Sequence, residues 1–203
     1  MRRRHLIVTA MAAACGFAVA VIAIVFAVTS GRSVREHGEA RIGGPFTLVD
    51  DTGAAVTERT LAGKPSAIYF GYTYCPEVCP TTLNDLARWM KALGPDADKL
   101  NYVFVTVDPA RDTPQVMHDY VSAFDPRIRG FTGTPGEIAK VAREYGVYYQ
   151  RIPTSDGGYV MDHSAALYLM GPDARFVSLI HYQEDDATAV DKLRRLAALA
   201  GSS

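Results

Sequence analysis

The chain has 203 residues, of which 48% are apolar and 21% are charged, and its formal net charge is −1. This length is sufficient for one globular domain of about 150–170 residues with an additional segment. Apart from the arginines in residues 1–5, the sequence has no basic stripe, which argues against nucleic acid as a partner.

The N-terminal segment has the pattern of a membrane anchor. Residues 1–5 are basic, and residues 6–28 contain no charged side chain. A run of this length crosses a hydrocarbon core of about 30 Å as a helix, whereas the apolar part of a secretory signal has only about 7–15 residues. We therefore expect a cytoplasmic segment over 1–5 and a single-pass transmembrane signal anchor over 6–29 in a bacterial-type inner membrane, with the C-terminal domain in the periplasm. A cleaved signal peptide is the alternative.

The anchor is followed by a polar, charged tether over residues 30–42, and one domain is expected over 43–203. Alternation of apolar and polar residues over 46–49, then a turn and a second short run at 55–57, predict that the domain opens with a β-hairpin.

The later elements are predicted from hydrophobic periodicity and from the helix-start signals Thr113-Pro114 and Thr134-Pro135. We expect strands at 66–72, 102–107, 128–131 and 147–151, helices at 81–93, 114–124, 135–145 and 185–199, a loop at 153–162, and a final hairpin of 164–170 with 175–181. This order predicts an α/β fold with a thioredoxin-like central sheet flanked by helices, together with the N-terminal β-hairpin.

Two cysteines follow the central strand at 66–72 and carry the chemistry. The strand should end at the sheet edge where open α/β folds place their sites, and a disulfide between Cys75 and Cys79 would close too small a loop to stabilise the fold much. Pro80 inside a helix would clash with the carbonyl of Pro76, so we expect a loop over 75–79 and a helix from near Pro80. Thiolate is favoured at a helix N-terminus, and it serves both disulfide exchange and soft-metal binding. The spacing leaves both roles open.

A third ligand would separate these two roles, and the predicted final hairpin contains two histidines. If Gly171 and Ala174 flank a two-residue turn, Ser164 faces His181 across the hairpin. His163 and His181 then lie at the same end but point to opposite faces. Only one of them is expected to face the cysteines, and the pattern does not select which.

Three motifs together resemble the Sco/SenC family of copper chaperones. They are GYTYCPEVCP at 71–80, VDPARDTP at 107–114 and DHS at 162–164; they follow the family's order, and the similarity runs from about 43 to 199. The resemblance implies a thioredoxin-like domain that binds one copper ion, as Cu(I) or Cu(II), through two cysteines and one histidine. By motif these ligands are Cys75, Cys79 and His163, and His181 has no role.

The resemblance also implies a metallochaperone rather than an enzyme. Copper would pass from an upstream copper donor to the dinuclear copper site of cytochrome c oxidase subunit II, and a thiol reductant would keep the cysteines reduced. The alternative is a membrane-tethered thiol–disulfide oxidoreductase, which needs Cys75 and Cys79 but not His163. A peroxidase is disfavoured. Peroxiredoxins have the motif Thr-x-x-Cys, whereas Thr73 lies only two residues before Cys75.

Several neighbours of the three ligands are candidates for supporting roles. Asp162 either orients the ring of His163 or is a solvated turn residue, and Asp108 should lie near the cysteines because it ends the adjacent strand. Arg111 and Asp112 are expected to order their loop as an ion pair. The loop before His163 is expected to let this ligand swing away.

Overall fold

The computed structural model describes residues 42–201. The predicted basic segment and transmembrane anchor, and all of the tether except Ile42, lie outside the described residues. Within 42–201, no helix has both the length and the apolar character needed to cross a membrane.

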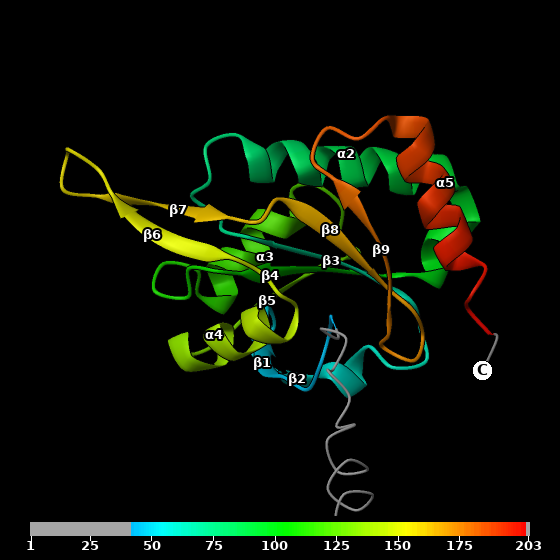
Figure 1. Ribbon diagram of the computed structural model, residues 1–203, viewed down its shortest axis with the longest axis horizontal. Helices are drawn as coiled ribbons and strands as arrows, with labels where there is room; N and C mark the ends of the chain where they lie inside the picture. Colours follow the sequence, from blue (N-terminus) through cyan, green and yellow to red (C-terminus); the bar gives the residue numbers. More distant parts are fainter. Residues whose placement is uncertain (1–41, 202–203) are drawn as a thin grey trace, which may run out of the picture. The chain divides into compact units, whose positions relative to one another are not determined.

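The described chain is built around a seven-stranded mixed sheet with the order β2-β1-β5-β4-β3-β8-β9 (Figure 1). Its strands are β1 (Thr47–Asp50), β2 (Ala55–Thr57), β3 (Ser66–Gly71), β4 (Asn101–Thr106), β5 (Ile128–Thr132), β8 (Ala166–Met170) and β9 (Phe176–His181). β3, β4 and β5 are parallel, and β8 runs antiparallel to β3. Every residue of β3 is buried, as expected for a central strand covered on both faces.

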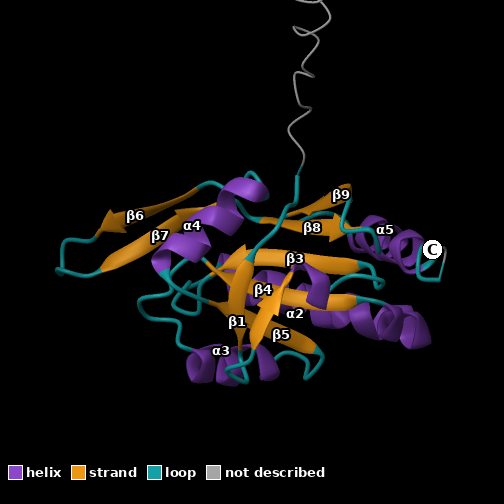
Figure 2. Cartoon of the chain, turned by 90° about the horizontal axis from the view of Figure 1, so that it is seen from below, coloured by secondary structure: helices purple, strands orange, loops and turns teal. Residues whose placement is uncertain are grey.

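Helices cover both faces of this sheet, as Figures 1 and 2 show. They are α2 (Val78–Leu93), α3 (Pro114–Ser122), α4 (Pro135–Glu144) and α5 (Asp186–Ala197), with short 3-10 helices η1 (Glu58–Thr60) and η2 (Gly94–Lys99). Neighbouring residues of β3 point to opposite faces. Phe70 packs against Tyr145 at the end of α4, with ring centroids 5.3 Å apart, while the hydroxyl of Tyr69 reaches Cys79 in α2. The predicted thioredoxin-like sheet flanked by helices is confirmed.

The predicted helix caps form as expected, but α2 begins earlier than predicted. The side chain of Thr113 accepts a hydrogen bond from the N–H of Val116, and Thr134 forms a capping box with Glu137. α2 starts at Val78 rather than near Pro80. A proline is tolerated there because the N–H groups of a first turn have no acceptor within the helix. Cys79 therefore lies in the first turn of α2.

The segment before His163 is a β-ribbon. The strand predicted at 147–151 overlaps its first strand, but the loop predicted over 153–162 was wrong where the second strand lies, at 159–162. β6 (Tyr149–Pro153) and β7 (Tyr159–His163) form a separate two-stranded antiparallel sheet that projects beyond the main sheet (Figure 1). His163 ends β7 and does not share a hairpin with His181. In the β8–β9 hairpin, Ala166 rather than Ser164 pairs with His181, because the ladder contains a bulge and the connection is longer than two residues.

The predicted N-terminal hairpin is present as β1 and β2, and Asp50 closes its turn. The Asp50 carboxylate accepts hydrogen bonds from the N–H groups of Thr52 and Ala54 and lies 2.8 Å from Nη2 of Arg129. Burial alone would raise the pKa of Asp50, but hydrogen bonds from Thr52 and Arg129 outweigh it and lower this pKa to about 2.

The lowered pKa of Asp50 predicts how stability depends on acid pH. The ionised form is favoured in the folded state, so Asp50 contributes about 2 kcal/mol above its unfolded pKa of 3.8, and this contribution is lost as the pH falls through about 2. Urea unfolding of wild type and Asp50→Asn should differ by about this amount at pH 7 and converge near pH 2. Asp98→Asn, at an exposed ion pair with Arg127, should differ little from wild type at either pH.

Candidate metal centre

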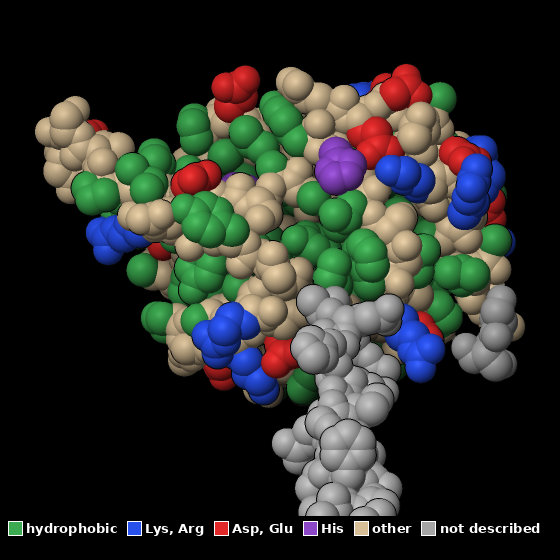
Figure 3. All heavy atoms as spheres, viewed as in Figure 1, with side chains coloured by type: hydrophobic (Ala, Val, Ile, Leu, Met, Phe, Trp, Pro, Cys, Tyr) green, Lys and Arg blue, Asp and Glu red, His purple; other side chains and the backbone are tan. Residues whose placement is uncertain are grey.

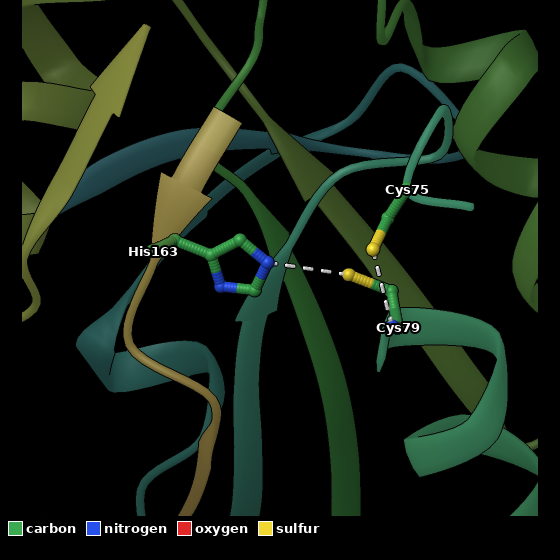
Figure 4. A group of neighbouring side chains, drawn as sticks. All are labelled: Cys75, Cys79 and His163. Carbon is green, nitrogen blue, oxygen red and sulfur yellow. Dashed lines mark hydrogen bonds between the residues drawn. The ribbon is translucent and has the colours of Figure 1, made fainter. Parts of the chain in front are cut away.

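The side chains of Cys75, Cys79 and His163 point toward one another (Figure 4). Nε2 of His163 lies 3.4 Å from Sγ of Cys79, and Sγ of Cys75 accepts a hydrogen bond of 3.3 Å from the backbone N–H of Cys79. The two sulfurs and one ring nitrogen all lie within 4.8 Å of one another. The structure thus brings together the three residues that the sequence motifs select, from three separate elements.

The sulfur of Cys79 is placed by the end of β3. Cys79 is completely buried in the first turn of α2, and its sulfur packs on the backbone of Gly71, the last residue of β3. A Cβ at position 71 would lie 2.8 Å from this sulfur and 2.7 Å from the ring of Phe104. Only glycine at the end of β3 therefore leaves room for the sulfur.

His163 is oriented by the backbone of the next residue. Its Nδ1 lies 3.0 Å from the carbonyl oxygen of Ser164, so a proton on Nδ1 is donated to this carbonyl and the lone pair of Nε2 faces the sulfurs. The rings of Tyr72 and His163 pack edge to face, with centroids 5.8 Å apart. Asp162 is exposed on β7, so the carbonyl of Ser164 orients the ring instead.

The two thiols are electrostatically unequal. A hydrogen bond from the Cys79 side chain lowers the pKa of Cys75, and a hydrogen bond from the backbone N–H of Cys79 lowers it further, against burial that raises it. The same interaction with Cys75 and deep burial raise the pKa of Cys79. These directions favour the thiolate on the half-buried Cys75, whose sulfur accepts the backbone N–H of Cys79, and the proton on Cys79.

The loop after β4 supports the cysteine segment differently than predicted. Asp112 is fully buried and accepts hydrogen bonds from the backbone N–H of Thr73, at 3.1 Å, and from its hydroxyl, at 2.6 Å. Arg111 pairs with Asp108 and not with Asp112, because the Asp112 carboxylate points inward toward Thr73 and Thr106. No local signal reveals the contact with Thr73, which lies 39 residues away in the sequence.

An open cavity of about 360 Å³ lies beside the donor atoms, between residues 75–78 and 160–163. The face in Figure 3 has hydrophobic side chains at the base of the ribbon and over the centre of the sheet, with Lys and Arg mainly toward its margins. Exposed apolar side chains near the cavity include Tyr74, at 61%, and Val160, at 38%. His181 is exposed at the end of β9, and its backbone N–H donates to Glu184.

Comparison with known proteins gives a consistent result. The family model described as SCO1/SenC matches residues 34–198. The chain is 43% identical over 155 residues to Protein SCO1 homolog 1, mitochondrial, from Arabidopsis thaliana. This alignment covers 76% of this chain and 46% of that protein. The chain is 38% identical over 190 residues to Protein SenC from Rhodobacter capsulatus, which covers 89% of this chain and 85% of that protein.

A solved structure of Bradyrhizobium japonicum ScoI with copper bound is also similar, with a TM-score of 0.71 and 51% identity over 76% of this chain and 99% of that one. The chain spans about half the length of the first mitochondrial relatives that it matches.

The close approach at Gly71 predicts a destabilising effect of Gly71→Ala. The added methyl must displace the Cys79 sulfur or the buried Phe104 ring, so we expect a loss of about 1–3 kcal/mol in the free energy of unfolding, measured with urea. Gly136→Ala is the matched control, because position 136 in α4 has nothing within 4 Å of the new Cβ. An unchanged stability in Gly71→Ala would contradict the close approach.

The inequality of the thiols predicts the order in which they react. In the reduced chain, iodoacetamide should modify Cys75 at least about tenfold faster than Cys79, because thiolate is the nucleophile and Cys79 is fully buried. Tandem mass spectrometry of the shared peptide follows both sites over time. In urea the two rates should become similar, and equal rates in the folded chain would refute the assignment.

Proposed function

The chain belongs to the SCO1/SenC family, and on this premise we propose that it binds one copper ion through Cys75, Cys79 and His163 and delivers it during cytochrome c oxidase assembly. The acceptor in this proposal is the dinuclear copper site of oxidase subunit II. The observation that carries the proposal is the convergence of two sulfurs and one imidazole nitrogen within 4.8 Å beside an open cavity.

The chemistry of the donor set supports copper as the cargo. Thiolates are soft ligands that favour Cu(I), and imidazole suits copper in either oxidation state. The lowered pKa of Cys75 supplies one thiolate, and binding of the ion displaces the proton from Cys79. The hydrogen bond to the Ser164 carbonyl keeps Nε2 of His163 free to bind.

Transfer by ligand exchange follows from the unequal exposure of the three donors. Cys75 and His163 line the cavity, whereas Cys79 is fully buried behind them. Ligands of an acceptor protein entering the cavity replace Cys75 and His163 first, and Cys79 releases the ion last. The protein acts as a metallochaperone and catalyses no reaction of its own in this scheme.

The remaining parts of the proposal concern location and partners. An anchor over residues 6–29 holds the domain at the periplasmic side of the inner membrane, where the oxidase subunit presents its copper site. An upstream protein supplies the copper. A thiol reductant is required, because a disulfide between Cys75 and Cys79 has no thiolate left to bind the ion.

A second candidate function is thiol–disulfide oxidoreduction. The observation that favours it is the pairing of an accessible, low-pKa Cys75 with a buried, high-pKa Cys79, which is the asymmetry that such enzymes use. This function needs both cysteines and has no use for His163, so the histidine discriminates between the two candidates.

Copper titration of the reduced full chain in detergent, without oxygen, tests the proposal. We expect one copper per chain, lost in Cys75→Ser and Cys79→Ser. Removing a residue that only hydrogen-bonds to a metal ligand typically weakens metal binding by roughly 10–100-fold. His163→Ala removes a proposed ligand itself and should weaken Cu(II) binding by more than this. His181→Ala is the matched control and should bind as wild type does, because His181 lies outside the donor group. Rapid disulfide exchange without stoichiometric copper binding would contradict the copper proposal and support the oxidoreductase function.

A further inference from the structure

The position of His163 depends on contacts outside the main sheet. The two cysteines follow β3, which is hydrogen-bonded on both sides, to β4 and β8. His163 instead ends β7, whose strand partner is β6 in a separate two-stranded ribbon. Within the described residues, no ladder of the main sheet includes β7. Only Ser164 and Ala165 join His163 to β8, and side-chain contacts with the loop after β4 hold the start of β7.

Arg111, Asp108 and Tyr159 form a closed set of contacts between the loop after β4 and the start of β7. The Arg111 guanidinium pairs with the Asp108 carboxylate, donates a hydrogen bond of 3.2 Å to the carbonyl of Tyr159 and lies 3.8 Å from the centroid of the Tyr159 ring. The Tyr159 hydroxyl closes the set by donating to Oδ1 of Asp108 at 3.0 Å. Asp108 is only 4% exposed.

The same guanidinium also touches the segment that leads to Cys75. Its central carbon lies 4.8 Å from the ring centroid of Tyr74 and 5.6 Å from that of Tyr72. Arg111 therefore stands between the cysteine segment and the histidine ribbon and contacts both. A planar guanidinium can satisfy a carboxylate, a carbonyl and several aromatic faces at once, which a lysine ammonium cannot.

We propose that Arg111, held by Asp108 and Tyr159, is a positioning residue that keeps the ribbon at the angle where Nε2 of His163 reaches the two sulfurs. Because two thiolates alone can retain Cu(I), while Cu(II) depends more on the imidazole, this clamp governs Cu(II) retention in particular. The inference rests on the proposed copper function and adds to it a residue that decides which oxidation state is held firmly.

The ribbon keeps its own β6–β7 ladder without Arg111, so loss of the clamp should loosen the ribbon rather than unfold it. At the base of the ribbon, the N–H of Ser164 donates to the carbonyl of Tyr148 at 3.0 Å, and the N–H of Tyr148 donates to the Ser164 hydroxyl at 3.1 Å. These bonds keep His163 on the ribbon when Arg111 is removed. What changes is the freedom of β7 relative to the cysteines.

The test compares Arg111→Ala, Arg111→Lys and Tyr159→Phe in the reduced full chain in detergent, with Arg127→Ala as a control that removes a paired arginine next to β5. In Arg111→Ala we expect Cu(II) binding to weaken about tenfold, with altered thiolate-to-Cu(II) absorption, while one Cu(I) per chain is retained. Arg111→Lys should recover only part of the Cu(II) affinity. Tyr159→Phe, which loses only the bond to Asp108, should show a smaller shift in the same direction.

A measurement on the metal-free protein separates this inference from the proposed function. Amide hydrogen exchange over residues 159–163 should accelerate in Arg111→Ala and remain unchanged in Arg127→Ala. If exchange accelerates but Cu(II) affinity and absorption stay as in wild type, or if Cu(I) and Cu(II) are lost equally, the inference is overturned. If wild type does not bind copper, the proposed function is contradicted instead. The hydrogen-exchange rates would still show whether Arg111 restrains residues 159–163.

Discussion

The contact between the Cys79 sulfur and the backbone of Gly71 is the constraint on which the site depends. β3 is paired on both sides and buried on both faces, so its last residue is among the least adjustable points of the fold. Cys79 packs on that point, Cys75 accepts a hydrogen bond from the Cys79 backbone, and Nε2 of His163 lies 3.4 Å from the same sulfur. Cys75 and His163 thus both contact Cys79, which is the most firmly fixed of the three donors.

The site combines a rigid half with an adjustable half. The cysteines belong to the strand–helix junction of the main sheet, whereas the histidine belongs to a projecting ribbon that side chains hold in place. The loop after β4 serves both halves, because Asp112 holds Thr73 before the cysteines and Asp108 with Arg111 holds Tyr159 before the histidine. Under the proposed copper function, this division would let His163 move without disturbing the two cysteines.

Sequence patterns succeeded where the physical cause is local. The caps at Thr113 and Thr134 are recognisable because a cap needs only its own next three residues. α2 begins earlier than predicted because the rule against proline applies to helix interiors, and Pro80 lies in the first turn. The sequence predicts a strand that overlaps β6 but a loop where β7 lies, because the exposed strands of the ribbon have little apolar periodicity. The register of β8 with β9 differs from the prediction because of a bulge and a longer connection.

By itself the sequence determined the α/β order of elements, the two cysteines at the end of a buried strand, and the family whose motifs contain Cys75, Cys79 and His163. Only the tertiary structure decided that the Ser164 carbonyl orients His163, and that Arg111 donates a hydrogen bond to the carbonyl of Tyr159, which lies 48 residues away in the sequence. The physical reason is that a strand or a cap is specified by neighbouring residues. A hydrogen bond between distant segments is specified by the packing of the whole domain and leaves no periodic trace in the chain.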